Sequence, residues 1–301
     1  MLSPVLDLLR TRRWFDTSLP FETSVHLTQG ACVWLLLSRA GVGDTHVKFS
    51  EHISLRDEAA RCEAASRCYP SLVPRFVGRA VVGGLDVLVC RSVDFCAADA
   101  AFLLKPATRP PVRLGLLAYF SAMPSAAAAA GLVELAVLSN TALFKALGDY
   151  SAGQWLAPLA RRWLGAHAGL LARLPALAQH GDFVLNNLGR TKRGDLVIFD
   201  WEDFGSVCLP GLDLFTLELS LAGGAAQFLT ARARQSVGLR ALRAQACAAI
   251  GLDLADYSAL TPIYALVFRY LKRNYGPDVR QQMDRLLLQL DAEPDATLLG
   301  G

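Results

Sequence analysis

One stretch decides the fold, and it is His180-Gly181-Asp182-Phe183-Val184-Leu185-Asn186-Asn187 followed by Ile198-Phe199-Asp200-Trp201-Glu202. Asn187 lies five residues after Asp182, and Asp200 lies thirteen residues after Asn187. Phosphoryl transfer needs a carboxylate that orients and deprotonates the attacking hydroxyl, and oxygen ligands that hold Mg²⁺ against the nucleotide phosphates. An H-x-D-x-x-x-x-N loop with a later aspartate supplies these groups. The pattern therefore predicts Asp182 as the catalytic base and Asn187 and Asp200 as magnesium ligands.

The residues around the motif predict where its side chains lie. The apolar run 196–199 favours a β-strand that ends at Asp200, and the polar residues 192–195 before it end in Gly-Asp, as a hairpin turn does. Asn187 and Asp200 are therefore expected on neighbouring strands or loops that face one site. The alternative is that Asp182 caps a helix and that the other two residues lie unrelated on the surface.

The HGD form of the loop, with DWE after it, resembles the aminoglycoside phosphotransferase and choline kinase family. The resemblance implies an α+β, two-lobed protein-kinase-like fold. Its small β-rich lobe (1–93) would bind nucleotide, and its larger, mostly helical lobe (94–301) would carry the catalytic loop and the acceptor site. It also implies an enzyme that uses Mg²⁺ and ATP, with GTP not excluded. The γ-phosphate would pass to a hydroxyl of an aminoglycoside-, choline- or sugar-like small molecule.

The sequence disfavours two other function classes. A non-catalytic, nucleotide-binding kinase relative is disfavoured because Asp182, Asn187 and Asp200 are all present. A protein kinase acting on serine or threonine is disfavoured because no A-P-E element or evident activation segment follows Asp200.

Two further aspartates lie close to the motif. Asp203-Phe204-Gly205 spells the triplet that holds the metal in protein kinases, but it comes three residues too late and beyond the apolar strand. We interpret that triplet as coincidence. Asp213 resembles the buried structural aspartate that braces the catalytic loop in this family. Its alternative role is to cap a helix ahead of Leu214, and the two roles are compatible.

The small lobe offers a candidate phosphate anchor. Val47-Lys48-Phe49 reads as part of a strand, and Lys48 resembles the lysine that contacts the α- and β-phosphates. The helix expected over 54–66 contains Glu58 and Glu63, which point in different directions. Because Glu58 shares the inward face with Cys62, we predict that Glu58 pairs with Lys48, with Glu63 as the alternative.

The other nucleotide contacts are predicted from weaker signals. The phosphate-covering loop retains a single glycine, Gly30, between the first two strands. Gly83 and Gly84 indicate a hairpin turn between strands 76–81 and 85–90. The segment 91–94 is expected to be the hinge that binds the adenine edge. Cys90 and Ser92 are therefore nucleotide-binding candidates.

Composition sets the remaining expectations. The chain has 301 residues, a net charge of +3, and seven scattered cysteines without a C-x-x-C pair, which is typical of a cytoplasmic protein with reduced thiols. No signal peptide is visible. Residues 114–133 carry no charge and are interpreted as a buried helix or a homodimer contact rather than a membrane span. We expect neither a membrane nor a nucleic acid as a partner; the partners predicted are a nucleoside triphosphate and a hydroxylated small molecule.

The large lobe is expected to be helical over 156–177, 212–222, 225–249 and 258–274. The aromatic and basic stretch 264–273 fits either a nucleic-acid patch or a core helix with solvated charges, and we favour the core helix. A choline-type acceptor would need an aromatic box, to which four residues could contribute: Trp155, Trp163, Trp201 and Tyr264. An aminoglycoside would need acidic residues, and those available beyond the motif are Glu134, Asp149, Glu218, Asp253 and Asp256.

Overall fold

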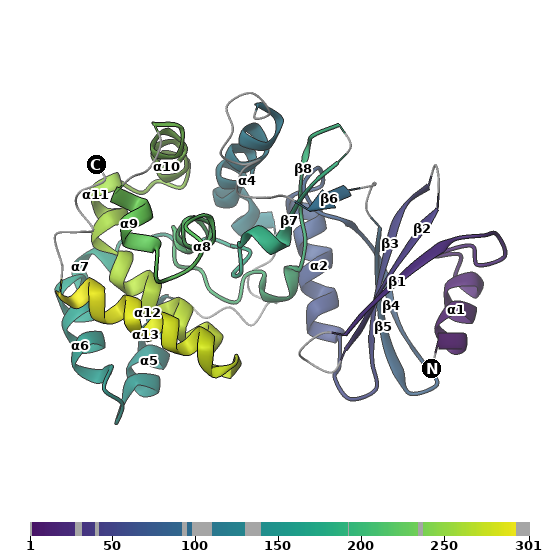
Figure 1. Ribbon diagram of the computed structural model, residues 1–301, viewed down its shortest axis with the longest axis horizontal. Coiled ribbons are helices and arrows are strands. Elements are labelled where there is room, and N and C mark those ends of the chain that lie inside the picture. Colours follow the sequence, from purple (N-terminus) through teal and green to yellow (C-terminus); the bar gives the residue numbers. More distant parts are fainter. Residues whose placement is uncertain are drawn as a thin grey trace.

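A computed structural model describes eight stretches of the protein: residues 2–27, 32–39, 42–91, 95–97, 110–129, 140–191, 193–233 and 237–292. The chain forms a small lobe built on an antiparallel sheet and a larger lobe built of helices (Figure 1). This arrangement confirms the predicted α+β, two-lobed fold. The predicted lobe boundary at residue 93 falls within 92–94, outside the described residues.

The small lobe is a five-stranded sheet in the order β1-β2-β3-β5-β4, with every neighbouring pair antiparallel. Its strands are β1 (Glu22–Leu27), β2 (Val33–Arg39), β3 (Val42–Ser50), β4 (Arg75–Val82) and β5 (Leu85–Arg91). Gly83 and Gly84 form the predicted hairpin turn between β4 and β5, with positive φ values of 56° and 84°.

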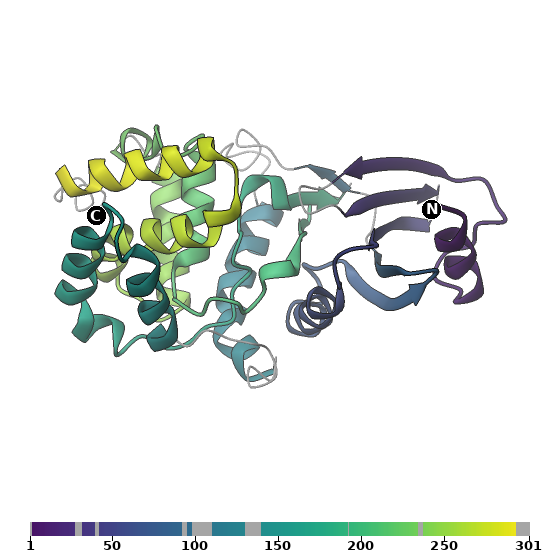
Figure 2. The same cartoon turned by 90° about the horizontal axis from the view of Figure 1, so that it is seen from below.

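The two faces of this sheet have different neighbours. Helix α1 (Leu2–Thr11) packs on the outer face, where Val5 and Leu9 share an apolar cluster with Val47 and Phe49 of β3. Side chains alternate along a strand, so Lys48 points to the opposite face. Helix α2 (Arg56–Cys68) lies beside that face, between the sheet and the large lobe (Figures 1 and 2).

The large lobe begins with α4 (Pro110–Ala129), which coincides with the uncharged run 114–133 as far as it is described. Leu116, Tyr119 and Met123 of α4 are buried in the chain's own core, so the buried-helix interpretation holds. The homodimer contact stays a prediction, and residues 130–133 lie outside the described part. Among the helices that the structure describes, none has the length and apolar character needed to cross a membrane.

Almost every residue of α8 (Leu212–Leu221) and α12 (Thr261–Leu271) is buried, and the structure describes further helices after α4. They are α5 (Asn140–Ser151), α6 (Ala157–Ala166), α7 (Ala168–Leu171), α9 (Phe228–Ala233), α10 (Val237–Ala249), α11 (Leu254–Ala259) and α13 (Pro277–Ala292). A second sheet, in the order β6-β7-β8, consists of β6 (Phe95–Ala97), β7 (Leu188–Thr191) and β8 (Leu196–Ile198). The described part of this lobe also contains the single turns η2 (Leu185–Asn187), η3 (Trp201–Asp203) and η4 (Lys272–Asn274).

Three predicted helices are wrong in extent. The helix expected over 156–177 breaks at His167 and ends at Leu171, and Pro175 cannot continue a helix. The helix expected over 258–274 is divided at Leu260, because Pro262 favours the first turn of a new helix. The helix expected over 225–249 is described as α9 and α10, with 234–236 outside the described residues.

Candidate active site

The catalytic-loop sequence is held by one buried carboxylate from α8. Asp213 is fully buried, and it accepts hydrogen bonds from the backbone N–H groups of His180 (2.8 Å) and Gly181 (3.0 Å). The Tyr119 hydroxyl donates a third hydrogen bond. Burial raises the pKa of Asp213, and the nearby His180 and these donors offset that only in part. Asp213 therefore braces the loop. The residue at the N-cap of α8 is Gly211, so the alternative role for Asp213 is wrong.

The loop requires glycine at position 181. Gly181 has a φ of +88°, a conformation that glycine adopts far more readily than other residues. A Cβ at this position would lie 3.0 Å from both the Cβ and the backbone oxygen of Asp203. The loop 180–187 thus passes directly against η3, the turn that follows Asp200.

His180 ties the loop to the strand that leads to Asp200. Its Nε2 lies 2.6 Å from the carbonyl oxygen of Phe199, which can only accept, so Nε2 carries the proton. Nδ1 then accepts from the backbone N–H of Asp182 at 3.2 Å. The backbone N–H of Phe199 also donates to the carbonyl of Asn187 at 2.8 Å. These bonds bring the loop residues Asp182 and Asn187 next to Asp200.

Asn187 has its amide nitrogen turned toward Asp182. Nδ2 donates to the carbonyl oxygen of Asp182 at 2.8 Å and lies 3.4 Å from the carboxylate oxygen Oδ2. Because the nitrogen is engaged in this way, the amide oxygen of Asn187 is the atom left to serve as a cation ligand.

Asp200 has an unusual backbone conformation. Its φ of 60° and ψ of 61° lie in the left-handed region, which non-glycine residues seldom adopt. Trp201, which follows it, is buried and donates from Nε1 to the carbonyl oxygen of Ile198 at 2.7 Å. Backbone strain of this kind concentrates at functional sites, where the surrounding structure maintains it. The Trp201 anchor fixes the turn and directs the Asp200 and Glu202 side chains.

Lys48 binds two carboxylates. Its Nζ lies 2.9 Å from Oε2 of Glu58 on α2 and 2.7 Å from Oε2 of Glu202 on η3. Glu63 lies elsewhere on α2 and pairs with Arg67 at 3.5 Å. Burial opposes the charge on Lys48, but the two carboxylates outweigh that effect and raise its pKa. Lys48 is therefore an ammonium group that joins the sheet, α2 and the large lobe.

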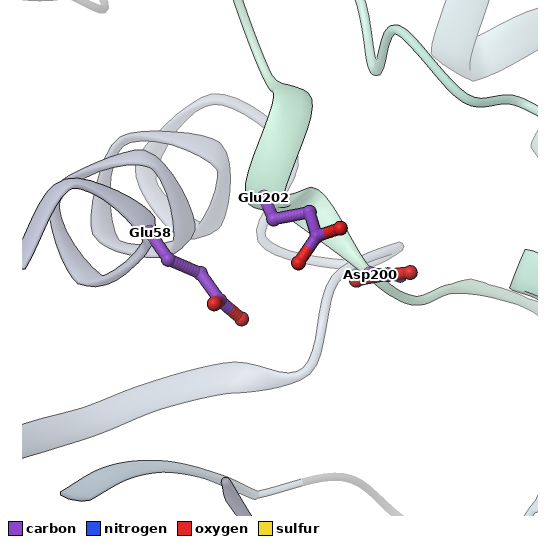
Figure 3. Close-up of side chains that lie close together, drawn as sticks. All are labelled: Glu58, Asp200 and Glu202. Atoms are coloured by element: carbon purple, nitrogen blue, oxygen red, sulfur yellow. The ribbon is translucent and has the colours of Figure 1, made fainter. Parts of the chain in front are cut away.

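Three carboxylates converge beside Lys48. The side chains of Glu58, Asp200 and Glu202 point toward one another, with one oxygen of each within 4.8 Å of the others (Figure 3). Burial, opposed by Lys48, raises the pKa of Glu58 to about 7. Burial and the Glu202 carboxylate raise the pKa of Asp200 to about 7. Since the Asp200 side chain is exposed, we attribute its shift chiefly to the crowding of carboxylates.

This donor set fits a magnesium ion. It offers oxygen atoms alone, which hard divalent cations prefer, and the Lys48 ammonium supplies a single positive charge beside three carboxylates. Asp200 was predicted as a ligand, whereas Glu202 was not assigned a role. Its spacing of two residues after Asp200 in the D-W-E sequence was the available signal.

Asp203 is the last residue of η3. Its carboxylate is 4.0 Å from the Arg61 guanidinium, which also donates to the backbone carbonyl of Glu202. Burial and the Glu202 carboxylate raise the pKa of Asp203. Asp203 is not part of the three-carboxylate cluster found among the described residues.

Aromatic rings link the lobes near Lys48. His46 lies two residues before Lys48 on β3, and its ring stacks on Trp34 of β2 with centroids 5.6 Å apart. The same ring lies 5.5 Å from Phe199, the large-lobe residue before Asp200. Burial lowers the pKa of His46 to about 4, so the imidazole is neutral near neutral pH.

The remaining nucleotide candidates are placed in part. Gly30 and Ser92 lie outside the described residues. Cys90 pairs with His46 across β5 and β3. A hydrogen bond to Cys90, together with burial, raises the pKa of Cys62 on α2, so the Cys90 side chain faces that helix.

Several acceptor-site candidates belong to the core instead. Trp201 and Tyr264 are buried, with exposed fractions of 2% and 0%, so the aromatic box cannot be built from them. Glu218 is also buried, where it binds the Arg243 guanidinium and the Tyr257 hydroxyl. Glu134 lies outside the described residues.

The stretch 264–273 contains a residue that sequence reasoning missed. Tyr264 and Phe268 are buried, as a core helix requires, but Arg269 is buried too and pairs with Asp284 at 2.8 Å, so the expectation of a solvated charge is wrong there. Lys272 is also buried, although its charge was expected to be solvated, and it lies against Asp182. The sequence carried no signal for this contact beyond the basic character of the stretch.

Known structures share this fold, although no protein-family model and no curated protein sequence matches the chain. The choline kinase from Streptococcus pneumoniae has a TM-score of 0.58 at 13% identity, over 96% of this chain and 98% of that one. The macrolide 2'-phosphotransferase from Brachybacterium faecium has a TM-score of 0.57 at 15% identity, over 94% and 96%. The aminoglycoside phosphotransferase APH(4)-Ia has a TM-score of 0.55 at 13% identity, over 100% of both chains. The resemblance to the aminoglycoside phosphotransferase and choline kinase family is thereby confirmed at the level of the fold.

Proposed function

We propose that the protein is a phosphotransferase that moves the γ-phosphate of ATP to a hydroxyl group of a small molecule. The observation that carries this proposal is the convergence of separate segments on one site. The catalytic loop supplies Asp182 and Asn187, the strand end supplies Asp200, β3 supplies Lys48 and α2 supplies Glu58. These groups match what phosphoryl transfer requires: a base, oxygen ligands for a cation, and a cation for the phosphates.

In this proposal each residue has a distinct task. Asp182 accepts the proton of the acceptor hydroxyl and fixes its approach to the γ-phosphate. Lys48 contacts the α- and β-phosphates, and Glu58 holds the Lys48 ammonium in place. Asn187 and Asp200 hold Mg²⁺, which, when bound, neutralises charge on the phosphates. The Glu202 carboxylate and the nucleotide phosphates compete for the Lys48 ammonium, so Glu202 gives up its contact with Lys48 when nucleotide binds.

The comparisons support a nucleotide and a small-molecule acceptor. The Streptococcus pneumoniae choline kinase has a structure in complex with AMP, with a TM-score of 0.52 to this chain. Proteins with similar folds are named as kinases or phosphotransferases of choline, macrolides and aminoglycosides. The classes proposed for this chain are aminoglycoside-, choline- and sugar-like hydroxyl compounds.

Transfer of the phosphate can be measured directly. The protein is incubated with ATP and a panel of hydroxylated small molecules and generic protein substrates, with magnesium or with a chelator, and products are identified by mass spectrometry. We expect one class of small molecule to gain a single phosphoryl group, and only with magnesium. Phosphorylation of the protein substrates alone would show that the acceptor is a protein and not a small molecule. No transfer to any acceptor would overturn the proposal.

A further inference from the structure

Lys272 lies directly against the proposed base. It is the first residue of η4, immediately after α12, and is 90 residues from Asp182 in the sequence. Its Nζ lies 2.8 Å from Oδ1 of Asp182, and the exposed fractions of the two side chains are 8% and 17%. The C-terminal helices of the large lobe therefore deliver a cation to the catalytic loop.

The Lys272 ammonium is held on several sides. It donates to the Tyr275 hydroxyl at 3.2 Å and lies 4.4 Å from the centroid of the Tyr275 ring. The Phe268 ring centroid lies 5.5 Å away. A buried ammonium is stable only with a partner that balances its charge, and the carboxylate bound to it is that of Asp182. Burial opposes the charged form of Lys272, but Asp182 outweighs this and raises its pKa.

The contacts on Asp182 differ between its two oxygens. Oδ1 is bound by Lys272 at 2.8 Å, whereas Oδ2 has Asn187 Nδ2 at a longer 3.4 Å. The carboxylate is therefore anchored strongly at one oxygen and weakly at the other. A base must present one oxygen to the acceptor hydroxyl at a fixed angle, and a small displacement lowers the rate.

We propose that Lys272 is a positioning residue for Asp182: it anchors Oδ1, so that Oδ2 faces the acceptor hydroxyl. The inference rests on the proposed function, in which Asp182 is the base. Lys272, at the junction of α12 and η4, would then have a role in catalysis in addition to the packing of this segment in the core. Lys272 also acts on Asp203. Burial and the Glu202 carboxylate raise the pKa of Asp203, and the positive charge of Lys272 offsets part of that rise.

The test compares two neighbouring positive charges. Lys272→Met keeps the aliphatic stem that packs between the rings and removes the ammonium. Arg273→Met removes a positive charge from the next residue, which is exposed and bonds to the Tyr270 carbonyl instead. We expect Lys272→Met to lower kcat ~10- to ~100-fold, the scale of a misplaced catalytic group, with an unchanged KM for ATP. Arg273→Met should stay within about twofold of wild type, since surface changes have small effects.

Two further variants separate positioning from packing. Lys272→Arg keeps a charge at the site and should recover part of the lost kcat. In the Asp182→Asn background, Lys272→Met should have little further effect on turnover, because residues that act as one unit are not additive. Equal kcat for Lys272→Met and Arg273→Met, or an undiminished effect of Lys272→Met without Asp182, would overturn the inference.

The ion pair can also be examined without substrate. A double-mutant cycle on the free energy of unfolding should show coupling between Lys272→Met and Asp182→Asn. Coupling together with a normal kcat for Lys272→Met would mean a structural pair and would overturn the positioning role alone. Absence of transfer by the wild-type protein would instead overturn the proposed function, and this inference with it.

Discussion

The two halves of the site are stabilised in different ways. In the large-lobe half, Asp213 meets hydrogen-bond donors from the catalytic loop and Tyr119, and Asp182 is balanced by Lys272. In the half around Lys48, which we call the small-lobe half, Glu58 from the small lobe and Asp200 and Glu202 from the large lobe bring three carboxylates to a single ammonium. If all three ionise, their charge of minus three against plus one leaves an excess of minus two. Burial and the neighbouring carboxylates, opposed by Lys48, raise the pKa values of Glu58 and Asp200 to about 7.

The difference shows which half depends on ligands. The loop that carries Asp182 needs no ligand to hold it, because each group that contacts Asp182 comes from the chain. The carboxylate cluster has more negative charge than the chain balances, and a divalent cation with nucleotide would complete it. We therefore expect variants of the large-lobe half to lose turnover or stability, and variants of the small-lobe half to lose ligand binding.

The largest effect is expected at the base. Asp182→Asn should fold and bind nucleotide, yet lose at least ~10²-fold in turnover, since general-base catalysis contributes on that scale. Turnover of the purified variant at saturating ATP and acceptor is the measurement, with a nucleotide titration as the check on binding. Turnover near that of wild type would show that Asp182 is not the base.

The brace should matter mainly for stability. Asp213→Ala leaves the backbone N–H of Gly181 and the hydroxyl of Tyr119 without their acceptor, whereas the N–H of His180 keeps the Tyr119 oxygen at 2.9 Å. Each buried donor without an acceptor costs about 1–3 kcal/mol. We expect a loss of at least about 2 kcal/mol in the free energy of unfolding, measured by denaturant titration. Asp195→Ala, at an exposed turn, is the control and should change that value by about 0.5 kcal/mol or less. Equal effects of the two variants would contradict the bracing role.

The phosphate anchor should affect nucleotide binding. Lys48→Ala removes a charge-assisted contact worth about 1.5–3 kcal/mol, so ATP binding should weaken ~10- to ~100-fold. Glu58→Ala should weaken it less, because Lys48 still reaches the phosphates, and Glu63→Ala should weaken it least. Calorimetric titration of the three variants gives the ranking. A greater loss for Glu63→Ala than for Glu58→Ala would contradict the role of the Glu58 pair.

The smallest effect is expected at the junction of the lobes. The pKa of His46 is lowered to about 4 by burial, while a histidine in the unfolded chain titrates near 6.5. Its stabilising contribution is therefore present above about pH 6.5 and is lost as the pH falls toward 4, because the unfolded chain takes up the proton first. Between about pH 7 and about pH 5 the loss amounts to about 2 kcal/mol. His46→Phe should show a shallower decline in the free energy of unfolding over that interval, and an equal decline would contradict this assignment.

The parts predictable from sequence are those that local spacing determines. Asp182, Asn187 and Asp200 lie within one loop and one hairpin, so their spacing was sufficient to place them together. The Glu58 and Lys48 pair followed from the inward face of a single helix. These relations do not depend on how distant helices pack.

Contacts between distant segments were not predictable in the same way. Glu202 meets Lys48 across 154 residues, and Lys272 meets Asp182 across 90. Both contacts depend on how the lobes and the C-terminal helices dock, which periodicity does not specify. The predicted helices continued past Leu171 and Leu260 because the apolar pattern continues there. The nearby prolines end or restart the helix at these points.

The central claim is that Asp200 holds the metal on which nucleotide binding depends. Nucleotide titrations with and without magnesium should be compared for Asp200→Ala and Asp203→Ala, which remove the same group from the N-cap and from the last residue of one turn. We predict that Asp200→Ala abolishes the magnesium-dependent part of nucleotide binding, whereas Asp203→Ala leaves it largely intact. The reverse ranking would show that the Asp203-Phe204-Gly205 triplet provides the ligand and would contradict the assignment of the metal site.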